Sequence, residues 1–332
     1  MKNKKLIVFD MDGVLVDVSK SYRETVRQTA KLFFKIAPSF EELPNPLFSL
    51  ADLAAVKQSG GLNNDWDLSC LVINLLFNQI EKPPVYRSKD PWAQYQETIS
   101  KCDMRALADF LRSTPEPLTT LLQKAGNTKN AFIYGLYTGD VGSGNIIKQI
   151  FQEVYLGKDL FKASYNQRPK FYQRDGLIHH EQLLIDKDML GRLAAKHILA
   201  IATGRPRAEA DYPLDHFGIR KYFTRIMALE DCLEQENRIL EAEGRKVSLS
   251  KPHPYMLDAI AEKIKDPVTE YIYVGDMPDD MVADKRAAAG FKGIGNLFST
   301  PDRARLKADL LQAGADSVIK DFEQLKSFMG SD

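Results

Sequence analysis

The sequence lacks several features that would point to particular classes of protein. Its 332 residues include only three cysteines, Cys70, Cys102 and Cys232. An odd number of widely spaced cysteines predicts neither a disulfide framework nor a zinc cluster, and it fits a reducing compartment. The 45 Lys and Arg residues balance the 45 Asp and Glu residues, so no net positive charge favours nucleic acid or an anionic membrane as a partner.

Long apolar runs are also missing. The first run, residues 6–9 (LIVF), ends at an aspartate and is too short for a signal peptide. No stretch approaches the ~18 apolar residues that a membrane-spanning helix needs. We therefore expect a soluble, cytoplasmic protein.

The composition is that of a globular protein with room for two domains. Hydrophobic residues make up 44% of the chain and charged residues 27%, which suits a sizeable buried core. A single domain usually has ~100–200 residues, so a chain of this length favours two domains.

Short apolar runs recur late in the chain, separated by segments of helical composition. They occupy residues 197–202, 225–229, 271–274 and 317–319. Such runs are typical of strands buried on both faces of a parallel sheet. Residues 6–9 have the same character, so we predict that they join the late strands in an α/β fold with a Rossmann-like parallel sheet.

The region between the first strand and the later ones has apolar residues at helical spacing, interrupted by prolines. We predict a core formed by residues 1–17 and 187–332, and an inserted, mainly α-helical domain at 18–186. The charged segment 230–246 is interpreted as a solvated amphipathic excursion of the core, with a partner-binding helix as the alternative.

An aspartate pair directly follows the first predicted strand. Asp10 and Asp12 lie two residues apart, at the carboxyl end of a strand, where open α/β sheets place their ligands. Their side chains point the same way if the strand direction continues, and Gly13 permits a turn. One carboxylate could attack phosphorus while the other protonates the departing oxygen. The alternative is a turn that caps the next helix.

A hydroxyl group follows the second predicted strand. Thr203, Gly204 and Arg205 come directly after residues 197–202. The hydroxyl of Thr203 on this tight turn could hold a phosphoryl oxygen, or it could simply cap a helix.

A lysine and an acidic turn complete the set. Lys251 precedes Pro252, which is well placed to open a helix; the lysine could neutralise phosphate charge or be an ordinary surface residue. The turn GDMPDD, residues 275–280, follows the strand at 271–274. Its carboxylates suit Mg²⁺, although an Asx-type turn with helix caps is the alternative.

In order, DMDGVLVD, ATGRP, SKPHP and GDMPDD resemble the four motifs of the haloacid dehalogenase-like superfamily of phosphohydrolases. The resemblance implies that Asp10 is the nucleophile and Asp12 the acid/base. It also implies that Thr203 binds the phosphoryl group, together with Gly204 and Arg205, and that Lys251 stabilises charge.

The same resemblance implies a Mg²⁺ cofactor. Asp10 and Asp276 would ligate the metal through their carboxylates and Asp12 through its backbone carbonyl. Asp280 would support either the metal or Lys251.

The motifs bear on three reactions that occur within this superfamily. Asp12 argues against dehalogenation, which needs neither a second aspartate nor a metal. Hydrolysis of a small phosphate monoester through an aspartyl-phosphate is the expected reaction, and the insertion resembles the helical cap of a subgroup that includes phosphoglycolate phosphatase, although it is longer. A phosphosugar mutase shares all four motifs and stays an alternative, as does a non-catalytic scaffold that binds a phosphorylated metabolite or a protein.

The inserted domain contains one unusual polar segment, residues 59–66 (SGGLNNDW). We predict that Asn63, Asn64 and Asp65, with Lys57 or Arg23 nearby, contact the leaving group of a small phosphorylated metabolite. The alternative is a turn whose Asx side chain caps the following helix.

Two other patterns in the inserted domain predict no ligand site. The glycines at 139, 142 and 144 are interpreted as a loop before a helix and not as a dinucleotide site. His179 and His180 would point to opposite faces of a strand, so a shared metal is not expected. The sequence does not indicate an oligomeric state.

Overall fold

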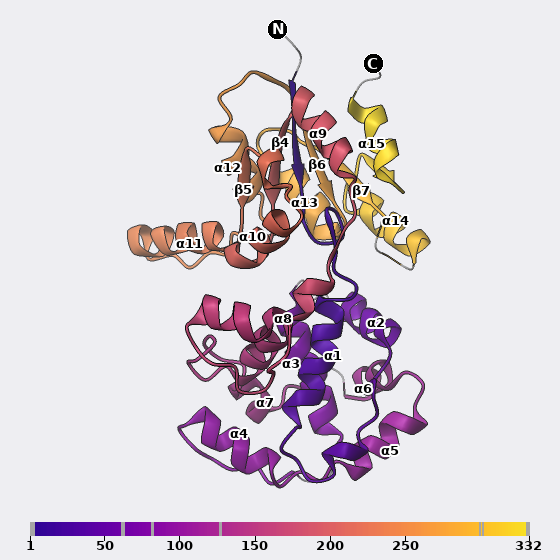
Figure 1. The fold of residues 1–332 in the computed structure, drawn as a ribbon, viewed down its shortest axis with the longest axis vertical. Coiled ribbons are helices and arrows are strands. Elements are labelled where there is room, and N and C mark those ends of the chain that lie inside the picture. Colours follow the sequence, from indigo (N-terminus) through magenta and orange to yellow (C-terminus); the bar gives the residue numbers. More distant parts are fainter. Residues whose placement is uncertain are drawn as a thin grey trace. The chain divides into compact units, whose positions relative to one another are not determined.

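The computed structural model describes residues 4–60, 64–80, 83–125, 128–298, 300 and 302–329. The chain divides into two compact units (Figure 1). The core unit comprises Met1–Val18 and Glu181–Asp332, and the inserted unit comprises Ser19–His180. Among the described residues, no helix has the length and hydrophobicity needed to cross a lipid bilayer.

The core unit contains a six-stranded sheet in which every neighbouring pair is parallel. The strand order is β5-β4-β1-β6-β7-β8. The strands are β1 (Lys4–Phe9), β4 (Ile198–Ala202), β5 (Arg225–Met227), β6 (Val268–Gly275), β7 (Lys292–Asn296) and β8 (Ser317–Ile319). The first strand of the chain thus pairs with strands from its second half, which confirms the predicted α/β fold.

Helices cover both faces of this sheet (Figure 1). The core helices are α9 (Lys187–Lys196), α10 (Arg207–His216), α11 (Leu229–Glu243), α12 (Tyr255–Lys263), α13 (Pro278–Arg286), α14 (Arg303–Gln312) and α15 (Phe322–Met329), with the 3₁₀ helix η3 (Arg220–Tyr222).

Successive side chains of β1 pack on opposite faces of the sheet, because neighbouring residues of a strand point in opposite directions. Ile7 and Phe9 pack in a cluster with residues of α9, α10 and α15. Leu6 and Val8 pack on the other face, with residues of α12 and α13. Both clusters are buried, which explains why this strand is apolar at successive positions.

Three elements differ from the sequence-based prediction. The strand β7 was not predicted, because its sequence KGIGN contains two glycines. The strand β5 ends at Met227, and Leu229 already begins α11. The helix α12 begins at Tyr255 and not at Pro252.

The helix α11 spans most of the predicted amphipathic excursion, and a partner-binding helix stays the alternative. It extends from the side of the core unit in Figure 1, and Cys232 is its buried residue. Leu233 and Leu240 are exposed, at 44% and 45%. All three cysteines of the chain are buried free thiols.

The chain enters and leaves the core unit through a short antiparallel pair. In it, β2 (Val16–Asp17) pairs with β3 (Gln182–Leu183). The segment before β3 is the 3₁₀ helix η2 (Leu177–His180). His179 and His180 therefore lie on this helix, and the prediction that they lie on a strand is wrong.

The inserted unit is helical. Its helices are α1 (Tyr22–Phe33), α2 (Leu50–Gly60), α3 (Asp65–Asn78), α4 (Pro91–Ile99), α5 (Arg105–Ser113), α6 (Pro117–Ala125), α7 (Ala131–Gly135) and α8 (Ile146–Tyr165), with the 3₁₀ helix η1 (Phe40–Glu42). Tyr22 of α1 stacks on Phe151 and Tyr155 of α8. Such large buried rings contribute most of the area that holds helices together. The glycine segment before α8 is a loop followed by a helix, as predicted.

Candidate active site

Three neighbouring strands place polar residues at their carboxyl ends. Asp10 follows β1, Thr203 follows β4 and Asp276 follows β6, and these strands are adjacent in the order β4-β1-β6. The backbone N–H of Asp10 donates to the carbonyl of Val274, at 2.9 Å, so this residue continues the β-ladder. Parallel strands end at one edge of a sheet, which brings these residues together.

Lys251 connects two of the acidic residues. Its Nζ lies 2.8 Å from Oδ1 of Asp10 and 2.8 Å from Oδ1 of Asp280. The lysine side chain is 16% exposed, so the pairs are only weakly screened by solvent. The two carboxylates raise the pKa of Lys251 well above its usual value, against the effect of burial. Lys251 is therefore a fixed positive charge beside Asp10.

Asp280 anchors this arrangement. Its Oδ1 also accepts a hydrogen bond from the hydroxyl of Tyr273, at 2.8 Å. Its Oδ2 accepts from the backbone N–H groups of Asp276 and Met277, at 3.1 and 3.0 Å. A Cβ at Gly275 would lie 2.4 Å from the Cβ of Asp280, so only glycine permits this close approach.

The acidic residues disfavour one another's charged forms. Burial, and then the carboxylates of Asp280 and Asp12, raise the pKa of Asp10 against the lowering effect of Lys251. Burial and the neighbouring carboxylates also raise the pKa of Asp276 well above its usual value. One lysine therefore does not balance this group of carboxylates, and a further cation would.

The donor set fits a divalent metal ion. Asp10, Asp276 and Asp280 each offer a carboxylate oxygen, and these atoms lie within 4.8 Å of one another. Such hard oxygen ligands suit Mg²⁺. Because both oxygens of Asp280 already accept hydrogen bonds, Asp10 and Asp276 are the better placed ligands, while Asp280 holds Lys251 and the turn.

Asp12 contacts an arginine. Nε of Arg205 donates to Oδ1 of Asp12 at 2.6 Å, and the same guanidinium pairs with Glu181. Arg205 is 2% exposed. It was predicted to bind substrate, and that role stays a prediction. Glu181 was missed because nothing in its local sequence marks a partner 24 positions away.

Thr203 and Gly204, the other two residues predicted to bind the phosphoryl group, directly precede Arg205 in the chain. Thr203 is buried, and its Oγ1 accepts a hydrogen bond from the backbone N–H of Arg205 at 3.2 Å. The position of a Cβ at Gly204 has no heavy atom within 4 Å. The structure thus brings Asp10, Thr203 and Lys251 to one edge of the sheet, as the motifs predict.

The predicted polar segment of the inserted unit is only partly described. Asn63 lies outside the described residues. Asn64 is the N-cap of α3, with Oδ1 accepting from the N–H of Asp67 at 2.7 Å, and Asp65 pairs with Lys57 at 2.9 Å. The capping alternative is confirmed, and contact with a substrate stays a prediction.

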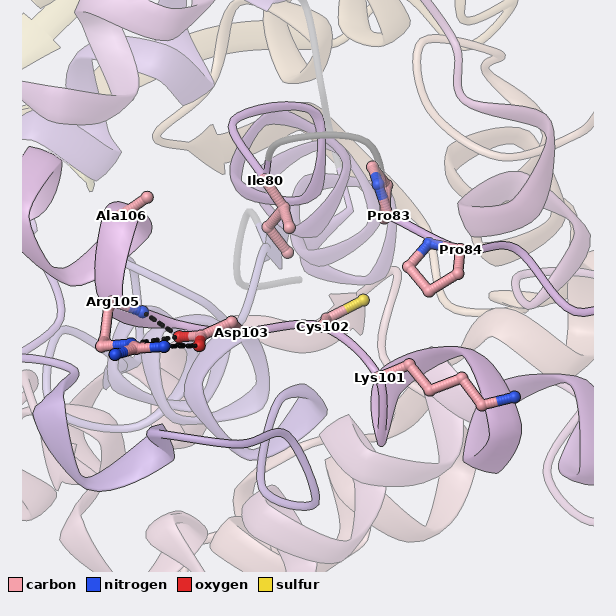
Figure 2. A pocket seen from close by; sticks show the side chains of 8 residues that line it. All are labelled: Ile80, Pro83, Pro84, Lys101, Cys102, Asp103, Arg105 and Ala106. Carbon is pink, nitrogen blue, oxygen red and sulfur yellow. Dashed lines mark hydrogen bonds and ion pairs between the residues drawn. The ribbon is translucent and has the colours of Figure 1, made fainter.

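Two cavities lie within the inserted unit. One, of about 370 Å³, is lined by Ile80, Pro83, Pro84, Lys101, Cys102, Asp103, Arg105 and Ala106. Figure 2 shows Arg105 bound to Asp103 at one side of it. The other, of about 520 Å³, lies between α1 and residues 171–174. Neither includes a residue of the Asp10 site.

Comparison with known proteins identifies relatives across most of the chain. The family model of haloacid dehalogenase-like hydrolases matches residues 4–287. A phosphoglycolate phosphatase of Haemophilus influenzae is 26% identical over 180 residues, which cover 52% of this chain and 70% of that protein. An imidazoleglycerol-phosphate dehydratase of Phytophthora nicotianae is 22% identical over 290 residues, or 87% of this chain.

The chain spans 42% of that Phytophthora protein, less than half of its length. A crystal structure from the Northeast Structural Genomics Consortium shares the fold over 99% of this chain and 98% of its own, with a TM-score of 0.65 and 20% identity. The family model covers most of the present chain, including the strand ends that carry Asp10, Thr203 and Asp276. The chain therefore belongs to the haloacid dehalogenase-like hydrolase family.

Proposed function

We propose that the protein is a magnesium-dependent phosphatase that hydrolyses a small phosphate monoester through an aspartyl-phosphate on Asp10. The observation that carries this proposal is the bridge from Lys251 to both Asp10 and Asp280. A buried carboxylate beside a fixed cation, at the carboxyl end of a central strand, is suited to attack on an anionic phosphate.

The first step transfers the phosphoryl group to the enzyme. An oxygen of Asp10 attacks phosphorus, and the bond between phosphorus and the ester oxygen breaks. The carboxyl proton of Asp12 moves to the departing oxygen, so the leaving group departs as a neutral alcohol.

The second step hydrolyses the intermediate. The oxygen of a water molecule attacks phosphorus, and Asp12, now a carboxylate, takes its proton. The bond between phosphorus and Asp10 breaks, which releases orthophosphate and restores both aspartates.

Fixed charges of the chain support both steps. The ammonium of Lys251 lies beside the attacking oxygen, and the hydroxyl of Thr203 would hold an oxygen of the phosphoryl group. Asp10, Asp276 and the backbone carbonyl of Asp12 would hold Mg²⁺, which supplies neutralisation of the charge shared by phosphate and carboxylates.

We propose a small phosphorylated metabolite of the cytoplasm as the substrate. The names of both relatives include such a compound, phosphoglycolate and imidazoleglycerol phosphate. Asn64 and Asp65 of the inserted unit would contact the leaving group, in addition to their roles at the start of α3.

A phosphate-release screen tests this function. The purified protein is incubated with Mg²⁺ and a panel of sugar phosphates, phosphorylated acids and alcohol phosphates, and orthophosphate and isomerised ester are both measured. Asp10→Asn provides the blank, and Asp159→Asn, at an exposed position of the inserted unit, is the matched control. Equal release by Asp10→Asn and the unaltered protein would refute the mechanism, and isomerised ester without free phosphate would establish a mutase instead.

A further inference from the structure

The core unit contains a buried ion-pair network that joins residues of two motifs to Glu181, which lies outside the four motifs. The guanidinium of Arg205 lies between the carboxylates of Asp12 and Glu181. The side chains of Arg205 and Glu181 are each 1% exposed, whereas that of Asp12 is 34% exposed. The network thus extends from a fully buried acid to the partly accessible acid/base residue.

The geometry fixes the guanidinium on its buried side. Nη1 and Nη2 of Arg205 each donate to a different oxygen of Glu181, at 3.1 Å. Nη1 also donates to the backbone carbonyl of Glu209, at 3.1 Å. A two-pronged pair of this kind sets the plane of the guanidinium as well as its position.

The adjacent edge of the guanidinium, formed by Nε and Nη2, faces Asp12, and Nη2 lies 2.5 Å from Oδ1 of Asp12 while it also pairs with Glu181. Nε of Arg205 donates to Oδ1 of Asp12 at 2.6 Å, so this oxygen is held in place. The backbone around Asp12 is fixed separately, because the N–H of Gly13 donates to the carbonyl of Val16 at 2.9 Å. The arginine therefore adds restraint to the side chain and not to the loop.

Glu181 also keeps the arginine in this position. A buried guanidinium that lost its buried carboxylate would be strongly destabilised. It would also be free to turn its fork toward the other anions nearby. With Nη1 and Nη2 paired to Glu181, the edge formed by Nε and Nη2 is the one that reaches the acid/base residue.

We infer that Arg205 and Glu181 are positioning residues that orient the carboxyl group of Asp12 for proton transfer to the leaving group. Arg205 holds Oδ1, and the proton passes from Oδ2 to the ester oxygen as the bond to phosphorus breaks. The inference rests on the proposed phosphatase function. It extends that function by two residues that act through Asp12.

Leaving groups of different basicity provide the test. The departing oxygen of phenyl phosphate needs a proton, whereas 2,4-dinitrophenolate departs without one. Glu181→Gln keeps the size of the side chain and removes its charge. We expect it to lower kcat/KM for phenyl phosphate about 10-fold or more and to change kcat/KM for 2,4-dinitrophenyl phosphate less than about threefold.

A second variant and a matched control accompany this measurement. Arg205→Lys keeps the charge but cannot form the two-pronged pair, and the same selective loss is expected. Asp231→Asn removes the carboxylate that pairs with Arg207, two residues further along the chain, without touching Asp12. It should affect both substrates equally, and melting temperatures of all three variants report on folding.

Each outcome has a definite meaning. An equal loss for both substrates in both variants, or no loss in either, overturns the inference. Asp12→Asn separates this result from the proposed function. If Asp12→Asn shows the selective loss and the Glu181 and Arg205 variants do not, only the positioning role fails. If Asp12→Asn loses neither activity, the acid/base mechanism itself is wrong.

Discussion

Asp284 is a buried acid whose ion pair among the described residues is with a partly exposed lysine, and replacing it should stabilise the protein. It lies on α13 and is 1% exposed. No donor among the described residues forms a hydrogen bond with either of its oxygens. The side chain of Lys285 is 41% exposed, and its Nζ lies 3.5 Å from Oδ2 of Asp284. This long contact with a partly solvated ammonium offsets only part of the cost of burying the carboxylate.

The size of the effect follows from the pKa. Burial raises the pKa of Asp284 from 3.8 to about 6. Each pKa unit corresponds to about 1.4 kcal/mol, so the charged form costs about 3 kcal/mol of unfolding free energy above neutral pH. Loss of the Lys285 contact and a small cavity reduce the benefit. We expect Asp284→Ala to raise the free energy of unfolding by about 2 kcal/mol.

The gain should depend on pH with a defined sign. The pKa of the folded state is raised, so the penalty is fully present above that pKa and disappears as the pH falls below the unfolded value of 3.8. The difference between Asp284→Ala and the unaltered protein should therefore be largest near about pH 8 and fall to less than half by about pH 4.5.

Urea unfolding followed by circular dichroism at these two pH values measures the effect. Asp309→Ala is the matched control, because Asp309 lies on α14, is 47% exposed and is 4.0 Å from Arg305; its effect should be small at both values. Destabilisation by Asp284→Ala near pH 8, or a gain that is the same at both values, would refute the reasoning.

Three further predictions concern the site. Gly275→Ala should lower the free energy of unfolding by about 2 kcal/mol or more and reduce phosphate release at least about 10-fold, because the added Cβ would collide with Asp280; unchanged stability and activity would contradict the close approach. A chelator should abolish phosphate release and Mg²⁺ should restore it, since the single positive charge of Lys251 does not balance the carboxylates of Asp10 and Asp276; activity that persists after exhaustive chelation would contradict this. Asn64→Ala should lower the stability of the inserted unit by about 1 kcal/mol through loss of the α3 cap, and the proposed substrate contact is abandoned if neither KM nor substrate preference changes.

The sequence predicted those parts of the site that depend on local pattern. The runs at residues 6–9, 197–202 and 271–274 are short and apolar, and each is followed within two residues by Asp10, Thr203 or Asp276. The carboxyl ends of the central strands could therefore be located. The parallel arrangement followed from the helical segments between them. Asp10, Thr203 and Asp276 were identified for this reason.

Features that depend on contacts distant in sequence were not predictable. β7 contains Gly293 and Gly295, which weaken a strand pattern. The structure explains them, since a Cβ at Gly293 would lie 2.5 Å from Oδ2 of Asp284 and one at Gly295 would lie 2.9 Å from Leu310. Glu181 likewise has no local signature, because its partner Arg205 is set by the fold.

The candidate site contains two triads of the same design: Asp10–Lys251–Asp280 and Asp12–Arg205–Glu181. Each has a carboxylate that reacts in the proposed mechanism, a cation and a buried carboxylate. In both, the third member is 1% exposed and holds the cation against the reactive group. The two cations, Lys251 and Arg205, suit the different roles proposed for Asp10 and Asp12. An ammonium is a compact charge that can follow the charge developing between nucleophile and phosphate, whereas a guanidinium fork fixes the orientation of a carboxyl group. Because the triads share no residue, loss of one buried anchor should impair either attack or proton transfer, and not both.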